Sequence, residues 1–178
     1  SVDLLDAGVR VLPEAELNRS FAETENKSVS VWRGTEPVLR RLWHRYADEG
    51  LHLVVDRQGG RFHYGPLLEA TFPDAVVAKV REQPSLAEYR LIERGDGSRR
   101  MRLLFAEKAE RRSFAVALAS CLAKYARETC MAAFNEDFAT LDPGLKPTAG
   151  YRNDGWRWLE DAAGALERRV DLGRIGGT

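Results

Sequence analysis

The short run Leu51–Val55 constrains the fold of this chain more than any other segment. It is rich in leucine and valine, and it is cut off by Asp56 and by the pair Gly59-Gly60. Strands of this kind are typically buried on both faces, in sheets that helices cover from either side. The run therefore predicts a buried, central strand of an α/β protein, and the glycine pair predicts a tight, hairpin-like turn after it.

Apolar periodicity and turn residues predict the remaining elements. We expect strands over 29–32, 61–64, 86–93 and 100–106, and helices over 35–50 (opened by Pro37), 66–80 (broken at Pro73), about 113–138 and about 154–170. A chain of 178 residues fits one domain with a real core. We therefore predict a single α/β domain over 1–178, with an N-terminal extension over 1–35 and a flexible tail over 171–178.

The amino-acid composition and the two cysteines predict the cellular compartment of the protein. Hydrophobic residues make up 44% and charged residues 30% of the chain, as in ordinary soluble proteins. No apolar run approaches the ~20 residues of a membrane span, so we expect no membrane partner. If Cys121 and Cys130 share one helix, nine residues separate them by ~13 Å, which is too far for a disulfide. We interpret them as core thiols of a cytoplasmic protein.

The net charge is zero, which argues against avid, non-specific binding of nucleic acid by the chain as a whole. Local basic faces stay possible, and the candidates are Arg40-Arg41 with His44-Arg45, Arg99-Arg100-Met101-Arg102, Lys108 with Arg111-Arg112, and Lys124 with Arg127. The alternative is that most of these arginines form an ordinary solvated surface.

Three acidic residues, Asp56, Glu110 and Glu128, come from separate segments, each at or near the end of a strand or helix pattern. Scattered carboxylates that converge on divalent cations are typical of metal-dependent nucleases. One straight helix over 110–128 would separate the two glutamates by ~27 Å. Convergence therefore requires Glu110 to lie in a loop, with the helix beginning near Ala115–Ala117. The alternative is that both glutamates are surface charges, one of them paired with Arg127 or Lys124.

Four motifs resemble the type 2 ribonuclease H family in order and spacing. They are Asp56-Arg57-Gln58-Gly59-Gly60-Arg61 with Gly65-Pro66, then Glu110, then Ala119-Ser120 and Ala123-Lys124 followed by Arg127-Glu128 and Met131, then Gly150-Tyr151. The resemblance covers roughly residues 50–165. It implies a ribonuclease H-like fold, with a mixed sheet of about five strands flanked by helices and Leu51–Val55 in the centre.

The resemblance also implies a function. A metal-dependent endonuclease of this family hydrolyses RNA phosphodiester bonds in an RNA/DNA hybrid or a duplex containing ribonucleotides, using two Mg²⁺ or Mn²⁺ ions. Asp56, Glu110 and Glu128 would be the catalytic metal ligands. The implied substrate-binding residues are Gly59, Gly60 and Arg61, together with Lys124 and Tyr151, the last of which would sense the ribose 2′-hydroxyl. A hairpin turn, solvated cations and a packed aromatic ring are the alternative interpretations of these five residues.

The chain also departs from the family pattern. A second catalytic carboxylate of the family falls on Arg57, the residues at Gly60 and Arg61 are exchanged, and Glu110 and Glu128 stand where the family has aspartate. We expect a divergent relative, in which Arg57 faces away from Asp56. Glu88 is an alternative source of the missing carboxylate, but a solvent-exposed Glu88 is the favoured expectation. A catalytically inactive domain that binds nucleic acid or protein is the alternative function, and the oligomeric state stays open.

Overall fold

The computed structural model describes residues 3–167 of the chain, which divides into two compact units. The first unit ends at Cys121 and the second begins at Leu122. The single domain over 1–178 stays a prediction, and the predicted tail over 171–178 lies outside the described residues. None of the helices formed by residues 3–167 combines the length and the apolar composition that a membrane crossing requires.

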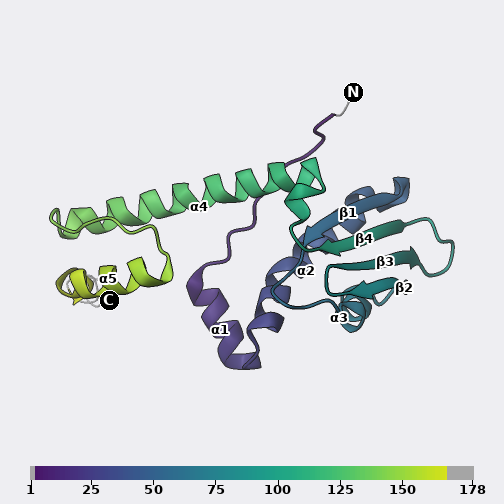
Figure 1. Ribbon diagram of the computed structural model, residues 1–178, viewed down its shortest axis with the longest axis horizontal. Helices are drawn as coiled ribbons and strands as arrows, with labels where there is room; N and C mark the ends of the chain where they lie inside the picture. The colour runs from purple at the N-terminus through teal and green to yellow at the C-terminus, as the bar shows by residue number, and fades with distance from the viewer. Residues whose placement is uncertain (1–2, 168–178) are drawn as a thin grey trace, which may run out of the picture. The chain divides into compact units, whose positions relative to one another are not determined.

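A four-stranded sheet with helices forms the first unit (Figure 1). Its elements are α1 (Glu14–Thr24), α2 (Lys27–Tyr46), the 3₁₀ turn η1 (Ala47–Glu49), β1 (Leu51–Asp56), α3 (Gly65–Thr71), β2 (Ala75–Gln83), β3 (Leu86–Glu93), β4 (Arg100–Ala106), the 3₁₀ turn η2 (Ala109–Arg111) and the beginning of α4 (Phe114–Leu141). The predicted α/β class and the strands over 86–93 and 100–106 are confirmed.

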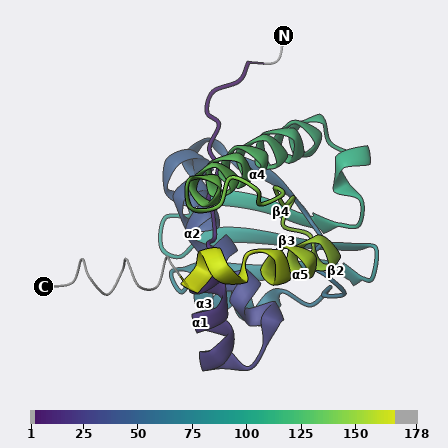
Figure 2. The ribbon, with the colours of Figure 1, turned by 90° about the vertical axis from the view of Figure 1, so that its left-hand side faces the viewer.

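The strand order is β1-β4-β3-β2, and Figure 2 shows β4, β3 and β2 following one another in this order. Strands β2, β3 and β4 form an antiparallel meander, and β1 pairs with β4 in parallel. The prediction of about five strands with Leu51–Val55 in the centre is wrong for the described residues. Four strands form, and β1 lies at the edge, because the expected partner strand over 61–64 is an irregular segment that leads into α3.

One face of the sheet packs against α2 and α3 and forms the main core. Trp32, Leu39 and Trp43 of α2 meet Leu91 and Leu103 of the sheet, and all five side chains are buried. Tyr64, just before α3, stacks on Phe105 of β4 with 3.6 Å between ring centroids and 5° between ring planes. Burial of this aromatic cluster supplies the main driving force for folding of the unit.

Helix α2 begins eight residues earlier than predicted, and the strand expected over 29–32 is part of it. The side chain of Asn26 caps the helix by accepting hydrogen bonds from the backbone N–H groups of Ser28 and Val29. Pro37, expected in the first turn, lies inside the helix. An internal proline costs about 3 kcal/mol, and burial of Trp32, Leu39 and Trp43 on one face offsets this cost.

The helix expected over 66–80 is only partly present. Helix α3 ends at Thr71, and β2 begins at Ala75 after the turn at Pro73. In β2, Ala75 and Val77 pack against the core while Val76 is exposed, which is the alternation of a strand. Pairing of β2 with β3 therefore overrides the local helical pattern.

The second unit contains the rest of α4 and the helix α5 (Arg152–Asp161). Phe138 of α4 and Trp158 of α5 pack edge to face, with 4.9 Å between ring centroids, and Ala162 and Ala165 complete a small core. A helix near each predicted position is confirmed, although residues 168–170 of the last prediction lie outside the described part. Cys121 and Cys130 were interpreted as core thiols, which is wrong, because both lie on exposed positions of α4.

Candidate functional site

Two of the three predicted carboxylates lie where two adjacent parallel strands end. Asp56 is the last residue of β1, and its register partner is Ala106, the last residue of β4. The Asp56 Oδ1 atom accepts a hydrogen bond of 3.0 Å from the backbone N–H of Ala109, which begins η2. Glu110 is the next residue. The topology therefore brings the residues Asp56 and Glu110 to the same end of the sheet, the end at which β1 and β4 finish. The carboxyl ends of parallel strands commonly form ligand sites.

Both carboxylates are accessible. Asp56 is exposed, and the Glu110 side chain is 43% exposed, with Oε1 3.8 Å from Nε of Arg111. Mg²⁺ is typically held by one or two protein carboxylates together with waters and substrate phosphates. Asp56 and Glu110 carry the oxygen donors that such a site uses, and Asp56 is bonded to the residue next to Glu110. Within residues 3–167, no group of three or more histidine, cysteine, aspartate or glutamate side chains gathers to hold a metal.

Glu128 belongs to the second unit and lies on an exposed position of α4. The helix begins at Phe114, directly after the short segment that follows η2, so Glu110 is outside it as the metal hypothesis requires. Convergence of Glu128 with Asp56 and Glu110 stays a prediction.

Arg57, at the position of the missing carboxylate, is held by neighbours other than Asp56. Its Nη1 donates a hydrogen bond of 2.5 Å to the Pro84 carbonyl, and its Nη2 lies 3.5 Å from Oε1 of Glu107. These partners stand in the β2–β3 turn and after β4. The guanidinium therefore has its own carboxylate, as expected for a side chain that faces away from Asp56.

The loop after β1 carries the predicted substrate residues Gly59, Gly60 and Arg61. Gly59 has a φ of +60°, which glycine adopts without strain, and both glycines are exposed. Arg61 donates a hydrogen bond of 2.5 Å from Nη2 to the Ser28 hydroxyl of α2. Arg61 therefore anchors this loop to α2, which leaves the two glycines as the open part of the loop.

In the second unit, motifs that are 20 residues apart in the sequence meet. The Arg127 guanidinium lies 4.4 Å from the ring centroid of Tyr151 and donates a hydrogen bond to the Ala149 carbonyl. Gly150 has a φ of +70°, and a Cβ atom there would come within 3.0 Å of Sδ of Met131. The spacing of Arg127, Met131 and Gly150-Tyr151 is therefore explained by packing. Tyr151 is still 62% exposed, and Lys124 is exposed.

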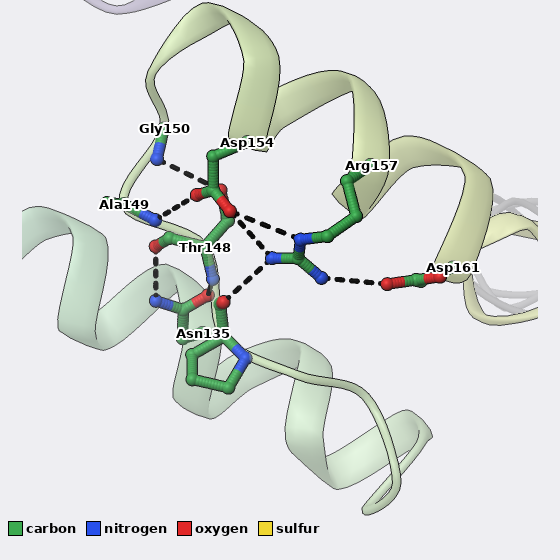
Figure 3. A network of polar contacts seen from close by, with 8 residues as sticks. Asn135, Thr148, Ala149, Gly150, Asp154, Arg157 and Asp161 are labelled. Carbon is green, nitrogen blue, oxygen red and sulfur yellow. Dashed lines mark hydrogen bonds and ion pairs between the residues drawn. The ribbon is translucent and has the colours of Figure 1, made fainter.

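A polar network holds the segment between α4 and α5 (Figure 3). Asn135 of α4 binds both backbone groups of Thr148, with its amide donating to the carbonyl and its carbonyl accepting from the N–H at 2.8 Å each. Asp154 of α5 accepts hydrogen bonds of 2.6 Å from the Thr148 hydroxyl and the Ala149 N–H, and Arg157 lies 2.8 Å from its Oδ1. The sequence did not single out Asn135, whose partners are the two backbone groups of Thr148, or Asp154, whose partners Thr148, Ala149 and Arg157 form no recognised motif.

This network makes the second unit sensitive to acid. The Thr148 hydroxyl, then Arg157 and the Ala149 N–H, lower the pKa of Asp154 to about 2, below the ordinary value of about 3.9. A carboxyl with a lowered folded-state pKa stabilises the fold above about pH 4, and this contribution is lost as the pH falls toward about 2. We expect Asp154→Asn to abolish this component of the acid transition in circular dichroism between pH 5 and 2.

The matched control is Asp161→Asn, on the same helix, since Asp161 pairs with Arg157 and has no bond to Thr148 in this network. This variant should keep the acid transition of the parent. Coincident acid titrations of the parent and Asp154→Asn would show that the network does not stabilise the unit.

A second polar cluster, which sequence reasoning missed, lines a pocket of about 450 Å³ beside α3 and β2. The hydroxyl of the buried Tyr89 donates to Glu82 and accepts a hydrogen bond of 2.8 Å from the Tyr64 N–H, and His63 Nδ1 lies 2.9 Å from Glu82 Oε2. Burial, and then the bond to Glu82, raises the pKa of Tyr89, and that bond is also the main cause that lowers the pKa of Glu82. These bonds fix the entry to α3, which accounts for the cluster structurally.

Comparison of the chain with protein-family models, curated proteins and solved structures found no match.

Proposed function

We propose that this protein is a metal-dependent endonuclease that cuts RNA phosphodiester bonds in an RNA/DNA hybrid or in a duplex containing ribonucleotides. The observation that carries the proposal is the position of Asp56 at the end of β1, bonded to the backbone of η2, the turn after the adjoining β4 that contains Glu110. An accessible carboxylate on a strand end, with a second one in the turn bonded to it, is suited to holding a divalent cation against a substrate phosphate.

Each group has a distinct task in this proposal. Asp56 and Glu110, with Glu128 as the third predicted ligand, would hold one or two Mg²⁺ or Mn²⁺ ions. A bound cation of this kind activates water and stabilises the leaving oxygen of a phosphodiester. The open turn at Gly59-Gly60 allows close approach of a phosphate or ribose, since no Cβ intervenes. Arg61, Lys124 and Tyr151 stay the predicted substrate contacts from the sequence, of which Lys124 and Tyr151 are exposed.

Arg57 favours a second candidate function, a domain that binds nucleic acid without cutting it. A fixed positive charge stands next to Asp56 where the resemblance implies a carboxylate, and Glu107 and the Pro84 carbonyl hold it in place. A metal site that lacks one carboxylate binds cations less tightly. Such a domain can lose its catalytic activity and still bind nucleic acid.

The test is cleavage of a duplex that contains ribonucleotides, with Mn²⁺, by the parent, Arg57→Glu and Arg57→Gln. Cleavage by the parent is the expected result. The glutamine variant is the matched control, because it removes the same contacts to Pro84 and Glu107 without adding a carboxylate. Cleavage by Arg57→Glu alone would mean that the natural chain is a silenced relative. Absence of cleavage by all three, with the duplex still bound, would support the binding domain.

A further inference from the structure

Four arginines gather on the face of the sheet that is turned away from the main core. Residues on this face alternate with the buried ones that pack against α2 and α3. They include Arg81 of β2, Arg90 of β3, and Arg100 and Arg102 of β4, all exposed. These four residues are called the arginine face below.

Strand register places these charges directly beside one another. Arg90 is the antiparallel partner of Arg102, and His52 of β1 is the parallel partner of the same Arg102. Like charges directly opposite each other destabilise a sheet. The arrangement is therefore unfavourable for the isolated sheet and favourable for contact with a negatively charged partner.

One carboxylate, Glu88 of β3, lies among the arginines and orients them. Arg102 donates a hydrogen bond of 2.7 Å from Nε to Oε1 of Glu88, which is buried. This bond is the main cause of a lowered pKa of Glu88, and the charges of Arg102, Arg90 and Arg81 lower it further. The alternative in which Glu88 supplies a metal ligand is not favoured, because its carboxylate is bonded to Arg102. The expectation of a solvent-exposed Glu88 is wrong, because the side chain is buried. The positive charges of the four guanidinium groups outnumber the single negative charge of Glu88. This face is therefore positively charged, although the net charge of the whole chain is zero.

Part of the arginine face is hollowed, and the small apolar cluster of Val54, Ala106 and Val116 lies between it and the position of Asp56. Arg90, Arg100, Arg102 and His52 line a groove of about 300 Å³. Asp56 projects from β1 on the same side as His52, and the four residue steps from one to the other correspond to ~13 Å along the strand. That span equals about four nucleotide steps of a duplex backbone.

Nearby side chains on this face, such as Val76, Ala78 and Ile92, are aliphatic. The outward positions of the four strands carry the imidazole of His52 and no phenylalanine, tyrosine or tryptophan. Unpaired bases are generally bound by stacking on aromatic side chains. A surface of arginines without such rings suits phosphates, whose recognition does not depend on base sequence.

We propose that the arginine face binds the sugar-phosphate backbone of a nucleic-acid duplex, about four nucleotide steps from the position of Asp56. This inference rests on the proposed function, because it names the surface that would hold the substrate. Binding through phosphates predicts affinity that falls steeply with salt and is independent of sequence.

The test is fluorescence anisotropy of a labelled RNA/DNA hybrid of about 20 base pairs, in EDTA, at NaCl concentrations from about 50 to about 200 mM. The parent is compared with the double variant Arg90→Gln/Arg100→Gln, which leaves the Arg102–Glu88 pair intact. We expect at least about tenfold weaker binding and a log–log salt slope smaller by about two, one for each lost phosphate contact. The matched control, Arg41→Gln/Arg45→Gln on exposed positions of α2, should leave the slope unchanged.

EDTA removes divalent cations, so the anisotropy assay measures binding of the duplex independently of metal-dependent cleavage. An unchanged slope in Arg90→Gln/Arg100→Gln would overturn the inference, even if the parent cuts the duplex with Mn²⁺. The expected loss of binding would support it, even if no variant cuts. Binding of the parent to anionic phospholipid vesicles, with no binding to the duplex, would also overturn it.

Discussion

Asp56→Asn is expected to abolish Mn²⁺-dependent cleavage while leaving the fold intact. Asparagine keeps an Oδ1 atom that can accept the hydrogen bond from the Ala109 N–H, so the turn η2 stays anchored to β1. The negative charge needed to hold a cation is lost. Because even residues behind a metal ligand cost about 10–100-fold when changed, we expect at least a hundredfold drop in rate, measured by gel-based cleavage of the duplex. Titration calorimetry with Mn²⁺ should show the matching loss of binding.

The companion variant Asp56→Ala separates the two tasks of this residue. It removes the charge and also the acceptor, so we expect the same loss of cleavage together with a stability cost of about 1 kcal/mol, the usual contribution of one hydrogen bond. Urea unfolding measures that difference. Full cleavage by Asp56→Asn, with reduced stability of Asp56→Ala, would mean that Asp56 only anchors η2.

Phe105→Ala is expected to cause the largest loss of stability in the first unit. Phe105 is buried, stacks on Tyr64, and has Trp32 and Tyr89 at 6.2 and 6.5 Å between ring centroids. Truncation of a buried phenylalanine costs about 3–5 kcal/mol, because the removed ring leaves a cavity among rigid neighbours. Urea unfolding followed by circular dichroism measures the change in free energy of unfolding.

Two controls frame this result. Phe105→Leu keeps most of the volume and should cost only about 1–2 kcal/mol. Phe114→Ala makes the same truncation at a residue that is 78% exposed, where changes stay within about 0.5 kcal/mol. Equal effects of Phe105→Ala and Phe114→Ala would contradict the assignment of Phe105 to the centre of the core.

Local patterns were sufficient where neighbouring strands are also neighbours in the sequence. Strands β3 and β4 alternate buried and exposed residues, and the turn at Gly95-Asp96-Gly97 joins them, so both were predicted with their observed bounds. Helix α4 was likewise predicted from its composition. The start of α2 was missed because Pro37 resembles a first-turn proline, whereas the capping residue is Asn26.

The candidate site was likewise predictable from the sequence only in part. The sequence identified Asp56 and Glu110 as chemically suitable, and it anticipated that Glu110 precedes the long helix. Their proximity depends on the parallel pairing of β1 with β4, which joins segments about 50 residues apart. No local pattern reports such a pairing, because it is selected by burial of the whole sheet against α2 and α3.

The sequence by itself determined the α/β class, the strands β3 and β4, the long helix and the chemical character of the candidate site, since these follow from side-chain periodicity and residue type. Tertiary structure alone decided that β1 is an edge strand, that Arg57 is held by Glu107 and the Pro84 carbonyl, and that Arg81, Arg90, Arg100 and Arg102 share one face. The physical reason is that register and strand order depend on contacts between distant segments, which are favourable only when the entire core forms.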